Sequence, residues 1–244
     1  MHKIYFYINY FVPLQRYSNN RMKKRSKITV KFFLNKNLAA RGEKGKALYP
    51  LYILVTYQRK STQLKSHFGG YMEDIEFLNT HHRGLVEFEA KTLQKVIEYE
   101  ADKYGDKFTL AGIGERYHQY ATPINNALER YLKEMLEKEM KATLEPMAIV
   151  PDYKNPLISS GLLYLAALRL IHDFDQKISP QLKGELEVNN SYFLLFPKLA
   201  GVYSFPTVID WENGSHKKEI IREFSQFNPE LTKSILKLIH KVIG

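Results

Sequence analysis

Three short runs near the start of the chain alternate between apolar and polar residues, the pattern of a strand with one buried face. The positions that share the apolar face are Ile28, Val30, Phe32 and Leu34 in the first run, Leu51, Ile53, Val55 and Tyr57 in the second, and Thr62, Leu64, Ser66 and Phe68 in the third. A polar loop separates the first two runs, a basic turn at Arg59 and Lys60 separates the second from the third, and Gly69 and Gly70 end the third. The pattern predicts a three-stranded antiparallel sheet.

Beyond Leu78 the spacing of apolar residues becomes helical. Helices are expected over about residues 85–104, 109–120, 123–145, 159–175 and 229–242. Gly105 ends the first of these, Thr122 and Pro123 supply the N-cap and first residue of the long third helix, and Asn228 begins the last. Residues 192–197 and 202–210 are expected as strands or irregular buried segments.

This pattern predicts an α+β protein, with a small three-stranded antiparallel sheet at the N-terminus and a mainly α-helical C-terminal part. We expect two domains, a basic sheet domain over residues 1–80 and a mainly helical domain over residues 81–244. A hydrophobic content of 44% with 17 Tyr and 14 Phe is enough for folded cores.

The positive charge of the chain is concentrated at its beginning. Fifteen of the 36 Lys and Arg residues lie at or before Lys65, where Glu43 is the only acidic residue, so this stretch carries a net +14. The rest of the chain holds 21 basic and 25 acidic residues, a net −4. Such one-sided charge is typical of proteins that bind a polyanion, because Lys and Arg release condensed counterions when they neutralise phosphates. Nucleic acid is the first partner to consider, and a solvated basic face without a partner is the alternative.

The first run, Ile28-Thr29-Val30-Lys31-Phe32-Phe33-Leu34-Asn35-Lys36, is followed by a Gly-containing loop, by Leu48-Tyr49-Pro50-Leu51-Tyr52-Ile53, and by a basic turn leading to Phe68-Gly69-Gly70. This order resembles the N-terminal arm-DNA-binding domain of Bacteroides-type tyrosine recombinases, which are similar to phage integrases. The resemblance covers roughly residues 27–80, and more weakly residues 85–145. It implies a sheet that binds arm-type DNA sites of a mobile element and takes part in DNA recombination.

The chain departs from that family at three points. The turn at Gln58-Arg59-Lys60-Ser61 lacks the glycine usual there, and Phe77 or Leu78 stands where the family commonly has Trp. None of the eight His residues has an Arg three positions later, so the recombinase catalytic signature is missing. We therefore expect a non-catalytic DNA-binding protein, with no catalytic residue, no metal ligand and no cofactor.

A sheet with one apolar face must cover that face, most simply with a helix, which leaves its polar face available. A β-ribbon fits the major groove of duplex DNA, where Gln and Arg pair with base edges and Lys contacts phosphates. The candidate nucleic-acid-binding residues are Arg25, Lys27, Lys31, Thr56, Gln58, Arg59, Lys60, Gln63 and Lys65. The C-terminal helices would then supply a core, a homo-oligomer interface or a surface for a protein partner.

Two other classes of function stay open. Pro151-Asp152 followed by Asp175 and Lys177 spells a metal-dependent nuclease signature, in which two carboxylates hold Mg²⁺ and the Lys polarises the attacked phosphate. That chemistry normally places the second acid on a strand, whereas Asp175 ends an expected helix. The other class is a protein-interaction module whose basic end meets an acidic partner.

Three further patterns favour an ordinary structural interpretation. His172 and Asp173 form a surface pair more readily than a catalytic one. His81 and His82 are expected in a loop, because adjacent residues seldom bind one metal ion. Gly112-Ile113-Gly114 lacks the preceding strand of a dinucleotide site.

The opening of the chain is apolar and aromatic. Tyr5, Phe6, Tyr7, Tyr10 and Phe11 either stack on single-stranded nucleic acid or, as we prefer, form an apolar extension that packs on the sheet. The run is too short for a membrane span, and its charges follow it, so we expect no targeting segment and no membrane partner. We also hypothesise that Met22 is the natural start. The chain has no Cys, which suits a reducing, cytoplasmic location.

Overall fold

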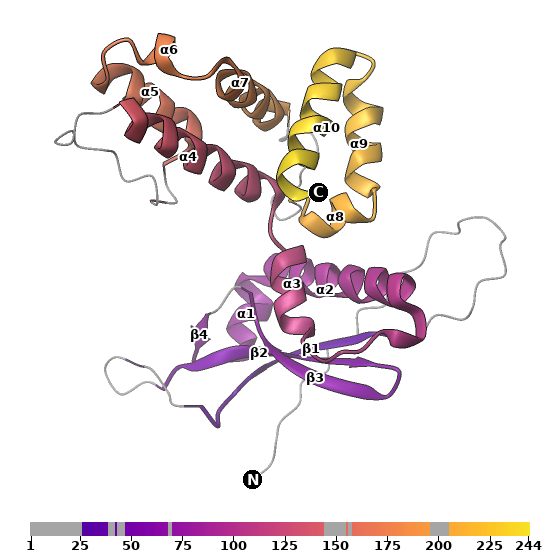
Figure 1. Cartoon of the computed structure of the whole chain (residues 1–244). Coiled ribbons are helices and arrows are strands. Elements are labelled where there is room, and N and C mark those ends of the chain that lie inside the picture. Colours follow the sequence, from indigo (N-terminus) through magenta and orange to yellow (C-terminus); the bar gives the residue numbers. More distant parts are fainter. Residues whose placement is uncertain are drawn as a thin grey trace. The chain divides into compact units, whose positions relative to one another are not determined.

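The computed structural model describes residues 26–38, 42, 47–67, 70–143, 155, 158–195 and 205–244. The protein is α+β, with a small antiparallel sheet followed by a mainly helical part, as the sequence predicted (Figure 1). It divides into two compact units, Met1–Ala121 and Thr122–Gly244. This division lies after Ala121, whereas the charge pattern suggested a boundary near residue 80. The helices that follow the sheet pack on it, so they belong to the same unit.

The sheet of the first unit is antiparallel, with β2 at its centre. Its strands are β1 (Thr29–Leu34), β2 (Tyr49–Tyr57), β3 (Lys60–Lys65) and the short β4 (Tyr71–Met72), which pairs with the beginning of β2. The expected alternation is confirmed, since Val30, Leu51, Ile53, Val55 and Leu64 are all buried. Phe68, which was expected on the same face, lies outside the described residues.

Three helices and a 3₁₀ turn complete the first unit. They are α1 (Ile75–His81), α2 (Arg83–Tyr104), the 3₁₀ turn η1 (Gly105–Lys107) and α3 (Ile113–Tyr120). The three helices lie on one side of the sheet and cover its apolar face (Figure 1). Gly105 ends α2 in a positive-φ conformation that favours glycine, as expected.

One helix of this unit begins later than the sequence predicted. Thr109 was expected to start a helix, but its hydroxyl accepts a hydrogen bond from the Ala111 N–H at 3.2 Å, which forms a turn. The helix α3 begins at Ile113, after Gly112 in the left-handed conformation.

The second unit is mainly helical in its described residues. Its helices are α4 (Ile124–Thr143), α5 (Ser160–Leu170), α6 (Phe174–Lys177), α7 (Pro180–Leu195), α8 (Val208–Glu212), α9 (Ser215–Phe224) and α10 (Pro229–Ile243). The expected start of α10 is confirmed, because the Asn228 side chain accepts a hydrogen bond from the Leu231 N–H at 3.0 Å.

The long helix α4 contributes to two cores. Near its start, Ile124 and Leu128 pack with apolar residues of α7, α8, α9 and α10, including Trp211. Near its end, Leu132 and Leu136 pack with residues of α5, α6 and α7. The apolar stripe predicted for this helix therefore holds both halves of the unit together.

Two sequence expectations for the second unit were wrong. The helix expected over residues 159–175 ends at Leu170, and Asp175 lies in the separate short helix α6. The two segments expected as strands or irregular buried segments each contain helical residues, since residues 192–195 end α7 and residues 208–210 begin α8. Just before α8, Thr207 forms an isolated β-bridge with Pro123, which precedes α4. Residues 196–204 lie outside the described residues.

Candidate nucleic-acid interface

The strand register brings nine side chains together on the sheet face opposite the helices, which we call the open face. Each row across β1, β2 and β3 contains one residue from each strand, and the rows are Thr29, Thr56 and Ser61, then Lys31, Leu54 and Gln63, and then Phe33, Tyr52 and Lys65. Ser61, Gln63 and Lys65 are exposed, and the other six are half-buried. These nine positions include two lysines and no acidic residue.

The row nearest the β2–β3 turn consists of small hydroxyl residues. Thr56 Oγ1 and Ser61 Oγ are 2.8 Å apart, so one hydroxyl donates to the other across the two strands. Small polar side chains allow a ligand to approach the backbone closely, and hydroxyls can donate to phosphate oxygens.

The turn between β2 and β3 has an unusual conformation. Gln58 and Arg59 have φ values of 49° and 62°, so both lie in the left-handed region, as the two central residues of a type I′ turn must. Such turns strongly prefer Asn-Gly, because a side chain is disfavoured there. The Gln58 amide donates to the Tyr57 hydroxyl at 3.3 Å, and the Tyr57 ring packs edge-on against Phe108. The Tyr57 side chain therefore holds the turn through its contacts with Gln58 and Phe108, while the Gln58 and Arg59 side chains stay exposed.

Four of the predicted residues, Lys31, Thr56, Gln63 and Lys65, lie together on the open face. Gln58 and Arg59 lie in the turn at its end, and Lys27 is exposed just before β1. Lys60 differs, because it pairs with Tyr57 and so belongs to the alternate set of residues that faces the helices. It is nevertheless exposed at the tip of the hairpin. Arg25 lies outside the described residues, as do Tyr5, Phe6, Tyr7, Tyr10 and Phe11.

Sequence reasoning did not single out the aromatic pair on this face. Phe33 and Tyr52 are directly opposite each other on β1 and β2, and their ring centroids are 6.0 Å apart. The alternation placed Phe33 on the polar face, but pairing it with Tyr52 requires the register of β1 on β2. That register depends on the length of the loop between the strands, which the pattern alone does not reveal.

The end of β3 is attached to the helices through a buried carboxylate. Glu89 of α2 is 1% exposed and accepts hydrogen bonds from the Ser66 hydroxyl at 2.6 Å and from the His67 N–H. Tyr117 of α3 also donates to it. Burial raises the pKa of Glu89, and these three bonds oppose the shift. These hydrogen bonds connect the segment after β3 to α2 and α3, and so stabilise the packing of the helices on the sheet.

His67 and His118 form a second link between β3 and α3. Their Nδ1 atoms are 2.9 Å apart, close enough for the two rings to share one proton. Burial, and secondarily the neighbouring His118, lower the pKa of His67.

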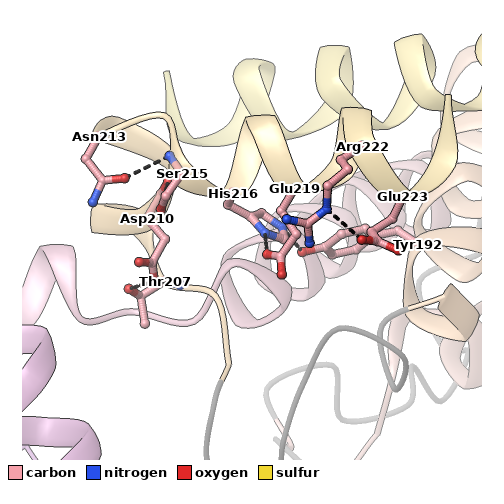
Figure 2. Close-up of polar contacts among 9 residues, drawn as sticks. All are labelled: Tyr192, Thr207, Asp210, Asn213, Ser215, His216, Glu219, Arg222 and Glu223. Atoms are coloured by element: carbon pink, nitrogen blue, oxygen red, sulfur yellow. Dashed lines mark hydrogen bonds and ion pairs between the residues drawn. The ribbon is translucent and has the colours of Figure 1, made fainter. Parts of the chain in front are cut away.

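The second unit contains a polar chain of Tyr192, His216 and Glu219, of which the first two are buried (Figure 2). The Tyr192 hydroxyl lies 2.8 Å from His216 Nε2, and His216 Nδ1 lies 3.1 Å from Glu219 Oε2. This geometry suits a neutral His216 that accepts from Tyr192 and donates to Glu219. Burial lowers the pKa of His216, against the opposing effect of Glu219. Tyr192 and His216 are each 1% exposed and belong to the core, whereas the Glu219 side chain is 34% exposed and connects them to the surface.

The residues of the nuclease signature are occupied by local contacts. Asp175 accepts from the Tyr164 hydroxyl at 2.9 Å and from Lys183 Nζ at 2.6 Å, and these bonds lower its pKa, that from Lys183 most. Lys177 Nζ donates to the His172 carbonyl at 2.9 Å. Asp152 lies outside the described residues.

The other patterns are also explained locally. His172 and Asp173 contact each other on the surface at 2.9 Å. His81 is the last residue of α1 instead of a loop residue, and its ring stacks on Phe77. Among the described residues, no group of three or more His, Cys, Asp or Glu side chains is placed to hold a metal ion.

Comparison with known protein families, with curated proteins and with solved structures found no match for this chain. None of the helices in the described part of the chain has the length and apolar character needed to cross a membrane.

Proposed function

We propose that the first unit binds duplex DNA through the open face and the β2–β3 turn, and that the protein is a non-catalytic DNA-binding protein of a mobile element. The observation that carries the proposal is the register that gathers Lys31, Thr56, Gln63 and Lys65 on one face with no acidic neighbour among its nine positions. The resemblance to the arm-DNA-binding domain of tyrosine recombinases supports DNA binding by the same sheet.

The charge distribution within the first unit supports this orientation. Residues 26–38 and 47–65, which contain β1, β2 and β3, hold six basic and no acidic residues, whereas residues 66–121, which contain α1, α2 and α3, hold six basic and ten acidic residues. Among the described residues, the sheet is therefore cationic and the helical layer anionic. A duplex would be attracted to the sheet and repelled by the helical layer.

We assign different roles to the polar residues. Lys27, Arg59 and Lys60 contact phosphates, because they are exposed cations around the hairpin and before β1. Gln63 and Gln58 are suited to pair with base edges in the major groove, since their amides both donate and accept. The strained turn agrees with such a role, because residues held in a disfavoured conformation tend to occur at functional sites.

The test is fluorescence anisotropy of the full chain with random duplex DNA over a series of salt concentrations. The affinity should fall steeply with salt, and Arg59→Ala with Lys60→Ala should reduce the slope of log K against log salt by roughly 2, about one for each phosphate that is no longer neutralised. Lys218→Ala with Lys237→Ala is the matched control, because it removes two exposed lysines from α9 and α10 of the second unit.

Weak duplex binding by the unmodified chain at low salt would overturn the proposal, as would equal decreases in affinity in the two double variants. The two remaining classes of function make different predictions. A nuclease would need Mg²⁺ and would lose cleavage on Asp175→Ala, whereas DNA binding should be indifferent to both. Binding to an acidic protein would give a shallower salt dependence than counterion release from DNA.

A further inference from the structure

The two ends of the open face differ in chemistry. The end near the turn carries hydroxyl residues, whereas the far row carries the rings of Phe33 and Tyr52 beside Lys65. The two rings are tilted by 44° with centroids 6.0 Å apart, and both are half-buried. The register places both residues on the open face, and the helices of the unit lie on the other side of the sheet (Figure 1).

The aromatic rings are next to groups that suit a nucleic-acid backbone. Lys65 is the cross-strand partner of Tyr52, and the adjacent row contains Lys31 and Gln63. An apolar partner segment would have to desolvate the exposed Lys65 ammonium group. An anionic ligand with flat apolar groups would instead stack on the rings and contact the cation beside them.

We propose that this end of the open face binds single-stranded nucleic acid, with successive bases stacked on Phe33 and Tyr52 and the backbone phosphates contacted by Lys31 and Lys65. Sheets that bind single strands use this combination of exposed aromatic residues and cations, because every base has a stackable face. A duplex does not offer its base faces, so the aromatic row adds a ligand class that the hydroxyl row and the turn do not need.

This inference uses the same face as the proposed duplex binding and shares Lys31 and Lys65 with it, but it adds Phe33 and Tyr52, to which the duplex proposal assigns no contact. Arg59 and Lys60 belong to the hairpin tip, whereas the Tyr52–Lys65 pair lies five residue pairs further along the strands than the Tyr57–Lys60 pair. The two activities can therefore be removed separately. A strand exposed at a duplex end or within an opened region could contact the aromatic row while the neighbouring duplex occupies the turn.

The test measures anisotropy of the full chain with labelled oligo-dT of about 12 nucleotides, within the range of known single-strand sites, and with a duplex of similar length. Phe33→Ala and Tyr52→Ala should each weaken oligo-dT binding by about tenfold or more, the usual effect of losing one stacked base, and should change duplex binding less than about twofold. Tyr52→Phe should retain oligo-dT binding, because stacking needs the ring and not the hydroxyl.

Leu54→Ala is the matched control, since Leu54 lies on the same face in the adjacent row and has no ring. It should leave oligo-dT binding nearly unchanged. If Leu54→Ala and Tyr52→Ala weaken binding equally, or if Tyr52→Ala weakens duplex and single-strand binding equally, the aromatic pair only stabilises the sheet and the inference is wrong.

Ultraviolet cross-linking of the unmodified chain to oligo-dT avoids any folding defect of the variants. Cross-linked peptides should contain Phe33 or Tyr52. Absence of oligo-dT binding, or cross-links confined to other peptides, would overturn the inference whatever the duplex result. Absence of duplex binding with retained cross-links at these two residues would instead refute only the proposed duplex function.

Discussion

In the β2–β3 turn, two residues adopt backbone conformations that lower the stability of the protein. Gln58 and Arg59 both have positive φ, which costs an L-residue with a Cβ about 1 kcal/mol each relative to glycine. The protein keeps two long side chains at positions where Asn-Gly is the common solution. We interpret this as stability given up for contact with DNA.

Replacing the turn by Gln58→Asn with Arg59→Gly should therefore raise the free energy of unfolding and weaken duplex binding in the same variant. The expected gain in stability is about 1 to 2 kcal/mol, because both residues then suit the left-handed conformation. Urea unfolding followed by circular dichroism measures the first effect, and anisotropy with duplex DNA measures the second.

Arg59→Lys is the comparison that separates charge from conformation. It keeps both the cation and the strain, so it should alter stability little and retain most phosphate binding. A turn variant that is more stable and binds duplex as tightly as the unmodified chain would show that the turn side chains do not contact DNA.

At the scale of elements, the loop between α2 and α3 is held by one arginine. Arg116 Nε lies 2.8 and 2.9 Å from the two carboxylate oxygens of Glu100, and its remaining nitrogens donate to the carbonyls of Ala111 and Thr109. Glu100 is 1% exposed. The guanidinium thus connects both helices to the loop, in a way that the single ammonium group of a lysine cannot reproduce.

Arg116→Ala should destabilise the first unit by roughly 3 kcal/mol, because it leaves the Glu100 carboxylate buried without its partner. The stability of Arg116→Lys should lie between that of the unmodified chain and that of Arg116→Ala, since lysine keeps the positive charge but loses most of the hydrogen bonds of the guanidinium group. Thermal or urea unfolding followed by circular dichroism measures the decrease in stability.

Arg83→Ala is the control, because the Arg83 side chain is exposed on the surface of α2 and its pair with Glu87 should contribute less than about 0.5 kcal/mol. Equal effects of Arg83→Ala and Arg116→Ala would contradict this account.

The sequence correctly predicted the strands and helix ends that are determined by residues within or next to the element itself. Strands β1, β2 and β3 follow from alternation, α2 ends at Gly105, and α10 begins at Asn228, all from local chemistry. The sequence also predicted the polar face of the sheet, because a period of two assigns four residues to one side, namely Lys31, Thr56, Gln63 and Lys65. The sequence did not predict the pairing of Phe33 with Tyr52, since that pairing depends on the register of β1 on β2. The helical conformation of Tyr192 and of residues 208–210 was not predicted, because aromatic and β-branched residues in a helix buried on several sides show no helical period.

At the scale of the whole molecule, the two units carry different charge. The first unit holds 21 basic and 11 acidic residues, whereas the second holds 15 of each, so the whole net charge of +10 belongs to the first. Electrostatic attraction to nucleic acid is therefore expected from the first unit alone. The second unit remains the proposed location of a homo-oligomer or protein-partner surface.

The two units can be followed separately, because the single tryptophan of the chain, Trp211, is buried in the core of the second unit. The same unit contains His216, whose pKa is lowered by burial from its ordinary value of about 6.5. Just below that pH, His216 is protonated in the unfolded chain but stays neutral in the folded unit. Stability contributed by neutral His216 is therefore present at neutral pH and is lost as the pH falls below about 6.5.

Urea unfolding monitored by Trp211 fluorescence should therefore show the second unit losing stability between about pH 7.5 and pH 5.5, with a slope of at most about 1.4 kcal/mol per pH unit from this one proton. His216→Gln should be less stable at pH 7.5, because it disturbs the bonds to Tyr192 and Glu219, but should show a smaller slope. His240→Gln is the control for replacing a histidine outside the core, because it removes an exposed histidine of α10 in the same unit. If His216→Gln keeps the full slope, His216 does not govern the acid sensitivity of this unit.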